Sequence, residues 1–560
     1  MKKLVYGFLT VLTIQGCGKT LVENASPTYR EAFFLNEQGL QDFWDSSLPE
    51  GMVTLDSEWF FLGKDSLPGI KREIPLGISD EVINLPHRIL APNHSLWYRK
   101  EVNLQAGVLL LDADDGAQLW ANGRRIPRSE DGEYFTISED GTYSLTIRAV
   151  NNAMAGGLRR VTWVSEVDFQ GWKSKESQRR DSILVRRKTA LLQDPGLRKE
   201  ISADSWLDQK EFLNSFPILL TDPVVLLDTD QKQVVRWVSE IAGEAVVEFA
   251  DGSREKVTSA DGVFTFPLNP DRLRFKIYQE KSFFGEYSFP FLEQKQFLKL
   301  ALWGDSQGGW DVFNHLALLI KNQQVDLSIG AGDLVNNGSE QYAYPRFLQK
   351  LSLMNAPQLP VPGNHDYDGF YEDLNPKLLK KYLFNPAQPT FGYQNLGVLA
   401  VLTLDPNEFF PVSIPASSEQ YRLLQEVMES ADWQNAPWKM IVLHQPPYSQ
   451  GWPGYSGERS IRELLEPFFH RGLVDLVVAG HTHDYERLTL DFSGNPVHFF
   501  VVGGAGGGLE PEGNSSEFPV MDRLIKKHHF GILKLSADHL DWQVMGVEGE
   551  LLDSLVVRRN

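Results

Sequence analysis

The chain has 560 residues and a formal net charge of −20, with 42% hydrophobic and 23% charged residues. These fractions are ordinary for a soluble protein, and the length suffices for several domains with cores of their own. The negative charge argues against a nucleic-acid surface, because phosphate backbones require a basic footprint. It also disfavours polyanionic substrates away from bound cations.

The amino terminus has the features of an export signal. It begins with MKK, residues 4–14 are mostly apolar, and IQGC ends at Cys17, the one cysteine of the chain. The apolar run is too short for an ordinary membrane-spanning helix and predicts a signal-peptide core. IQGC resembles a bacterial lipobox, and a lone cysteine cannot form an internal disulfide.

We therefore expect residues 1–17 to be a lipoprotein signal peptide with its lipid on Cys17. The protein would be exported and anchored to a membrane of the bacterial cell envelope, in the outer membrane or periplasm or at the cell surface. The alternative is cleavage by ordinary signal peptidase, which would leave a soluble secreted protein.

Residues 28–170 contain short strand candidates separated by Gly, Pro, Asn and Asp clusters, which predicts an all-β domain. The pieces LPH, LWYRK, LWANG and AVNN in this range resemble galactose-binding-like jelly-roll domains. The resemblance implies a fold and leaves carbohydrate binding open. Trp97 and Trp120 are core aromatics in many such modules.

Two shorter segments follow. Residues 171–209 are predicted to be a linker with a helix, whose basic cluster would form a solvated face or touch anionic lipid. Residues 210–292 contain alternating runs such as VVRWV and RFKIY, which predict a small antiparallel β-sandwich.

Five short polar blocks lie within residues 297–545. They read GDSQ (304–307), GDLVN (332–336), GNHD (363–366), HQPP from residue 444, and GHTH (480–483). Each follows an apolar run typical of a buried strand. Because a parallel sheet gathers the carboxyl ends of its strands along one edge, we expect these carboxylate, amide and imidazole groups to converge. That mixture suits a two-metal hydrolytic site.

The blocks and their order resemble the calcineurin-like metallophosphoesterases, and GHTHDYER is most similar to their purple acid phosphatase branch. The resemblance implies a four-layer α/β/β/α metallophosphoesterase domain over residues 297–545. It also implies that residues 210–292 are fibronectin-III-like. The expected fold class is therefore multidomain β plus α/β, with two N-terminal β-sandwich domains before the metallophosphoesterase domain.

The resemblance also assigns site residues. Asp333 would bridge two metal ions, Asp305 and His483 would bind the first, and Asn364, His444 and His481 the second. His365 would contact the phosphate or protonate the leaving oxygen.

The expected cofactors are two divalent or mixed-valence ions of Mn, Zn or Fe. The expected reaction is hydrolysis of a phosphate monoester by a hydroxide held between them. The alternatives are a phosphodiesterase or nucleotide pyrophosphatase, or a glycan-binding surface lipoprotein whose phosphoesterase domain is inactive.

Two positions depart from the family pattern. Gln307 stands where the common pattern has His, and Asn336 stands where purple phosphatases have Tyr. We expect Gln307 to bind the first metal ion through its amide oxygen, the alternative being a hydrogen bond nearby. Without the Tyr we expect no tyrosinate-to-iron colour, and an oxygen-rich first site favours Mn²⁺.

Three further features lie near the blocks. Asp366 and Asp484 would either orient imidazoles from behind or be exposed loop acids. His528 and His529 are expected to form a surface pair, the alternative being a contact with the substrate.

Overall fold

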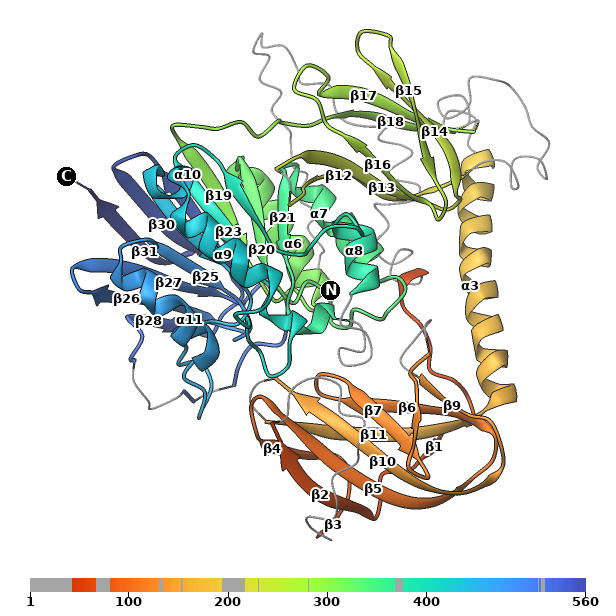
Figure 1. Ribbon diagram of the computed structural model, residues 1–560. Coiled ribbons are helices and arrows are strands. Elements are labelled where there is room, and N and C mark those ends of the chain that lie inside the picture. Colours follow the sequence, from red (N-terminus) through yellow and green to blue (C-terminus); the bar gives the residue numbers. More distant parts are fainter. Residues whose placement is uncertain are drawn as a thin grey trace, which may run out of the picture.

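The computed structural model describes residues 43–66, 81–129, 134–152, 155–193, 217–229, 231–280, 282–367, 376–511, 513–514 and 519–559. In these ranges the chain forms two β-rich units and a carboxyl-terminal unit of two sheets flanked by helices (Figure 1). The predicted signal peptide and Cys17 lie outside the described residues. No helix in the part that is described is both long and apolar enough to cross a membrane.

The first β unit contains eleven strands. They are β1 (Val53–Thr54), β2 (Trp59–Asp65), β3 (Glu81–Ile83), β4 (His87–Leu90), β5 (His94–Leu104), β6 (Gly107–Ala113), β7 (Ala117–Ala121), β8 (Arg124–Ile126), β9 (Tyr134–Ile137), β10 (Gly141–Asn151) and β11 (Ala155–Ser165). One sheet has the order β1-β11-β6-β9 with β4 also on β11, and the other has the order β3-β2-β5-β10-β7-β8.

Two tryptophans of this unit bear on whether it binds sugar. Trp97 and Trp120 are each 1% exposed, and their ring centroids lie 5.3 Å apart. These rings therefore stabilise the unit from within and present no surface for a sugar to stack on. The galactose-binding-like resemblance stays a prediction.

A long helix, α3 (Glu166–Gln193), follows β11 directly and begins inside the range predicted as β domain. The Ser165 hydroxyl accepts a hydrogen bond from the Asp168 backbone N–H at 3.1 Å, which caps the helix start. Its basic side chains contact protein groups. Arg180 lies over the Tyr342 ring at 4.6 Å, and Lys188 Nζ is 2.7 Å from Glu240. The helix runs from the first β unit to the second (Figure 1), and Arg180 also joins it to Tyr342 of the carboxyl-terminal unit.

The second β unit has seven strands. They are β12 (Leu219–Leu227), β13 (Gln233–Ser239), β14 (Gly243–Phe249), β15 (Arg254–Ser259), β16 (Val263–Pro267), β17 (Arg274–Gln279) and β18 (Ser282–Ser288). One sheet has the order β15-β14-β17-β18. The other strands, β16-β13-β12, continue into the carboxyl-terminal unit because β12 pairs in parallel with β21 (Gln358–Val361). The unit is therefore joined to its neighbour by a shared sheet.

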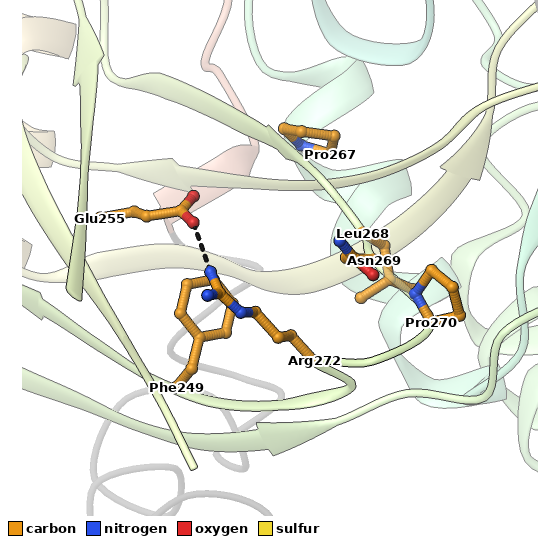
Figure 2. Close-up of a pocket in the computed structure, with 7 residues that line it drawn as sticks. All are labelled: Phe249, Glu255, Pro267, Leu268, Asn269, Pro270 and Arg272. Carbon is orange, nitrogen blue, oxygen red and sulfur yellow. Dashed lines mark hydrogen bonds and ion pairs between the residues drawn. The ribbon is translucent and has the colours of Figure 1, made fainter. Parts of the chain in front are cut away.

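A surface pocket of the second β unit is drawn in Figure 2. Arg272 lies over the Phe249 ring at 4.9 Å and donates to Glu255 at 2.8 Å. The other lining residues are Pro267, Leu268, Asn269 and Pro270. None of the predicted site residues lines this pocket, so it gives no support to a catalytic role there.

The carboxyl-terminal unit begins at residue 298. Its strands besides β21 are β19 (Leu298–Trp303), β20 (Leu327–Ala331), β22 (Gly392–Asn395), β23 (Leu399–Thr403), β24 (Trp438–Val442), β25 (Leu476–Ala479), β26 (Tyr485–Phe492), β27 (Asn495–Val502), β28 (Arg523–Ile525), β29 (His529–Leu535), β30 (His539–Gly546) and β31 (Leu551–Arg558). Its helices are α6 (Trp310–Gln323), α7 (Ala343–Leu351), α8 (Lys377–Leu383), α9 (Glu419–Glu429), α10 (Ala431–Asn435) and α11 (Arg459–His470), with short 3₁₀ turns η1 (Ser352–Met354), η2 (Asn364–Asp366) and η3 (Pro406–Glu408).

The strands of this unit form two sheets with a core between them. One sheet has the order β16-β13-β12-β21-β20-β19-β29-β30-β31 and the other β22-β23-β24-β25-β27-β26-β28. Apolar side chains from both sheets form one buried cluster. Helices α6 to α8 pack outside the first sheet and α9 to α11 outside the second. The unit therefore has four layers, with helices on both outer faces.

Two predictions about this unit are wrong. The predicted end at residue 545 is too early, because β31 pairs antiparallel with β30 and completes the edge of the sheet. His529 is not a surface residue: it is fully buried at the start of β29, with its ring centroid 5.5 Å from that of Tyr485.

Candidate metal centre

The five polar blocks follow strand ends that lie side by side. Three blocks come after β19, β20 and β21, which are parallel neighbours in one sheet. The other two come after β24 and β25, which are parallel neighbours in the facing sheet. The carboxyl ends of both sets meet at one edge, and the structure brings the blocks together there.

Two glycines permit this close approach. A Cβ atom on Gly363 would lie 2.2 Å from Asp333 Oδ1, and one on Gly480 would lie 2.3 Å from Asp305 Oδ2. Any side chain at either glycine would therefore displace a carboxylate, which explains the glycine at the start of these two blocks.

The backbone is strained at four of the predicted residues. The φ angles are 60° at Asp305, 35° at Gln307, 49° at Asp333 and 75° at His481. A left-handed conformation costs a residue other than glycine about 1–3 kcal/mol, and such residues cluster at functional sites. The strain points to function at this edge of the sheets.

Two groups of potential metal ligands share Asp333. Ligand atoms of Asp333, His444 and His481 lie within 4.8 Å of one another, and so do those of Asp305, Asp333 and His483. His444 Nε2 is 3.2 Å from Asp333 Oδ2 and 3.2 Å from His481 Nδ1. His483 Nε2 is 3.5 Å from Asp305 Oδ1. These residues therefore form two groups that share Asp333.

Backbone carbonyls determine which imidazole nitrogen faces the centre. His444 Nδ1 lies 2.9 Å from the Ala331 carbonyl, and His483 Nδ1 lies 2.6 Å from the Gly508 carbonyl. When Nδ1 carries the proton, Nε2 presents a lone pair to a carboxylate oxygen. Two such lone pairs repel unless a cation lies between them. The donor set therefore fits two bound metal ions.

The charges of the buried groups depend on one another. Burial would raise the pKa of Asp333, but His444 and His365 outweigh it and lower that pKa below its ordinary value. Burial would lower the pKa of His444, but Asp333 and Asp305 raise it to about 9. The pKa of His365 is also raised, because Asp333 and Asp115 outweigh burial. These carboxylates thus stabilise positive charge at the centre.

The two departures from the family pattern have different surroundings. Gln307 Nε2 donates to Asp333 Oδ2 at 2.7 Å, so its amide reaches the group formed with Asp305. A half-turn of this amide would present its oxygen instead. The Asn336 side chain is exposed, whereas its backbone carbonyl lies 2.9 Å from His365 Nδ1. This contact leaves His365 Nε2 facing Asp333, 4.0 Å from Oδ2.

Asp366 and Asp484 are both fully buried, so neither is an exposed loop acid. Asp366 accepts hydrogen bonds from the backbone N–H groups of Leu334, Val335 and Gly363 at 2.8–3.3 Å. It therefore ties two of the polar blocks together and orients no imidazole. Burial, together with Glu486, raises the pKa of Asp484 well above its ordinary value.

One residue at the centre was missed by the sequence argument. Asp115, in the turn between β6 and β7 of the first β unit, accepts a hydrogen bond from Asn364 Nδ2 at 2.7 Å. Its surroundings in sequence, ADDGA, are those of an ordinary turn. No local pattern indicates that this turn reaches a residue 249 positions away.

Comparisons with known proteins agree with this geometry. Residues 298–485 match the calcineurin-like phosphoesterase family. The chain is 28% identical over 232 residues to purple acid phosphatase 21 of Arabidopsis thaliana, which covers 40% of this chain and 51% of that protein. It is 32% identical over 252 residues to probable inactive purple acid phosphatase 24 of the same plant, covering 39% and 40%.

A solved structure has a similar fold. The purple acid phosphatase PPD1 from yellow lupin (Lupinus luteus) seeds superposes with a TM-score of 0.51 at 14% identity, covering 83% of this chain and 93% of that one. The chain spans about half the length of the first curated relatives. It contains a calcineurin-like phosphoesterase domain with purple acid phosphatases among its relatives, which confirms the family resemblance of its polar blocks.

Proposed function

We propose that this protein hydrolyses phosphate esters with the help of two metal ions, and that phosphomonoesters are its preferred substrates. The observation that carries the proposal is the carboxylate of Asp333, shared by two groups of ligands at adjacent strand ends. The matching phosphoesterase domain supports it. One relative carries the name of a probable inactive phosphatase, so turnover has to be measured.

The two groups around Asp333 and the family pattern together support an assignment of the residues that would hold the two ions. Asp305, His483 and Gln307 would hold the first, Asn364, His444 and His481 the second, and Asp333 both. Such ions, of Mn, Zn or Fe, supply Lewis acidity, activate water and neutralise phosphoryl charge. The protein positions the ligands through backbone carbonyls at Ala331 and Gly508. His365 Nε2 would hydrogen-bond a phosphoryl oxygen or protonate the leaving oxygen.

Hydrolysis of p-nitrophenyl phosphate and of bis-p-nitrophenyl phosphate tests this function. Purified protein is stripped of metal and resupplied with Mn²⁺, Zn²⁺ or Fe, beside the variant His481→Ala. We expect metal-dependent turnover that the variant lacks, because it removes a ligand from the second group. No turnover with any metal in a folded protein would refute the proposal.

The ratio of the two rates decides the substrate class. A faster monoester reaction is the expected result. A faster diester reaction would instead support a phosphodiesterase or nucleotide pyrophosphatase, the alternative that Gln307 keeps open.

We also propose that the protein is exported and anchored through a lipid on Cys17. The support is the sequence of residues 1–17, with its basic start, apolar stretch and IQGC ending. A bacterial culture fed a clickable fatty-acid analogue should label the wild-type protein and leave Cys17→Ser unlabelled. The wild type should also sediment with membranes. An unlabelled wild-type protein recovered in the soluble fraction would contradict the anchor.

A further inference from the structure

We propose that Asp115 of the first β unit is a positioning residue for the metal centre, which holds the Asn364 amide so that its oxygen can bind the second metal ion. The inference rests on the proposed function, since the orientation of Asn364 matters for catalysis only if the centre binds metal. It gives the first β unit a role in the active site itself.

Asp115 lies in a turn that is held by hydrogen bonds from its side chain and from its backbone. Its Oδ1 accepts from Asn364 Nδ2 at 2.7 Å, and its Oδ2 accepts from the Asn152 backbone N–H at 2.7 Å. The Asp115 N–H donates to the Val150 carbonyl at 3.2 Å, and the Val150 N–H donates to the Gly116 carbonyl at 3.0 Å. The segment at the end of β10 therefore holds the backbone of the turn and Oδ2 of Asp115, which leaves Oδ1 for Asn364.

The chemistry of a carboxylate determines how the Asn364 amide lies. An ionised carboxylate only accepts hydrogen bonds, so it can face the NH₂ group of Asn364 and repels the oxygen. On the other side of the amide, Gln445 Nε2 lies 3.3 Å from Asn364 Oδ1 and also donates to Asn407 Oδ1 at 2.6 Å. The amide is thus held from both ends with its oxygen turned away from Asp115. Metal ions bind an amide through its oxygen, so this is the orientation a ligand needs.

Contacts between the units keep Asp115 in place. Asn93 donates to Glu458 Oε2 at 2.7 Å and accepts from the Val412 N–H at 3.1 Å. Val150 packs against Tyr367 and Phe410 in a small buried cluster. In Figure 1 the first β unit, in orange, lies directly beside the carboxyl-terminal unit. The interface therefore docks the first β unit as a fixed part of the centre.

Titration calorimetry of Mn²⁺ into metal-stripped protein tests the role of Asp115. The wild type should bind two ions. In Asp115→Asn the new NH₂ group faces either Asn364 or the Asn152 N–H, so one oxygen contact is lost. We expect this variant and Asp115→Ala to bind one of the two ions about 10- to 100-fold more weakly, the usual cost of removing a hydrogen-bond partner of a metal ligand.

Exchanging the two residues tests whether metal binding can be restored. In the double variant Asp115→Asn with Asn364→Asp, the new amide can donate to residue 364 and still accept from Asn152. We expect the double variant to bind the second ion more tightly than the two single variants predict by addition. Additive losses, or wild-type binding by Asp115→Ala, would overturn the proposal.

Asn93→Ala is the matched control, because it weakens the same interface without touching the centre. We expect it to bind both ions as the wild type does, because the packing of Val150 against Tyr367 and Phe410 still holds Asp115 in place. A loss equal to that of Asp115→Asn would show that docking alone matters and would also overturn the role of Asp115. A wild type that binds no metal would instead refute the proposed function, so the two failures are distinguishable.

Discussion

Asp333→Asn is expected to lose both metal ions and to lower turnover of p-nitrophenyl phosphate by at least about a thousandfold. The substitution keeps the shape of the side chain but removes the one charge that both ligand groups share. Lewis-acid stabilisation is worth several kcal/mol, and each 1.4 kcal/mol is about tenfold in rate. Metal content by atomic emission and initial rates at saturating substrate check the prediction.

The fold should survive this change. The new amide can still accept from the His365 N–H, which is 2.9 Å from Asp333 Oδ1. It can donate to His444 Nε2 on its other side once Gln307, which donates to Oδ2 in the wild type, turns its amide. His444 and His365 favour the charge of Asp333 in the folded protein, so its removal leaves these imidazoles without their partner and has a cost in stability. We therefore expect the metal-free variant to remain folded and to melt below the temperature of the metal-free wild type.

His483→Ala separates the two ligand groups and serves as the comparison for Asp333→Asn. Its imidazole belongs to the group with Asp305 and not to the group with His444. One ion should be lost and one retained. Two retained ions in Asp333→Asn would show that Asp333 is not the shared ligand.

The metal centre was largely predictable because each of its polar blocks can be recognised from the residues directly before it in the sequence. Each block sits directly after an apolar run, and parallel strands bring such ends together whatever the details of packing. That argument placed Asp305, Asp333, Asn364, His444 and His481 at one edge. The role of Asp366 could not be predicted in this way. Its carboxylate accepts hydrogen bonds from three backbone N–H groups in two loops, and a contact with the backbone leaves no pattern of residue types in the sequence.

Contacts between the units could not be predicted from the sequence in the same way. Asp115 lies in a turn whose residues would suit any surface loop, and only docking brings it to Asn364. The parallel pairing of β12 with β21 joins segments predicted to belong to separate domains. Strand β31 was missed because its pattern, LLDSLVV, forms the edge of the sheet and is only partly buried. In each case the deciding interaction is long-range, whereas periodicity reports only local burial.

Trp542→Ala is expected to destabilise the carboxyl-terminal unit by about 3–5 kcal/mol, the usual cost of truncating a large buried aromatic residue. Trp542 is fully buried between the two sheets, with its ring centroid 4.3 Å from that of Phe500. Gly531 makes room for it, since a Cβ atom there would lie 2.0 Å from the indole ring. No neighbouring side chain can refill this volume without moving a strand.

The indole N–H also takes part in a polar contact across the sheets. It donates to the Tyr485 hydroxyl at 3.0 Å, which in turn donates to Asp553 Oδ2 at 2.8 Å. Trp542→Phe keeps a six-membered ring and loses the donor with the five-membered part of the indole, so we expect a smaller cost of about 1–2 kcal/mol. The stability lost from the wild type to Trp542→Phe therefore reports mainly the hydrogen bond, and the further loss to Trp542→Ala reports the packing.

Differential scanning calorimetry measures these differences. For a unit of this size, about 4 kcal/mol corresponds to a fall of roughly 10 °C in melting temperature. Gln543→Ala, on the opposite face of the same strand, should change it little, because Gln543 is only partly buried. Since the two facing sheets carry different ligands of the centre, the temperature at which phosphatase activity disappears should fall together with the melting temperature. Activity that outlasts the melting of Trp542→Ala would show that the centre does not depend on this core.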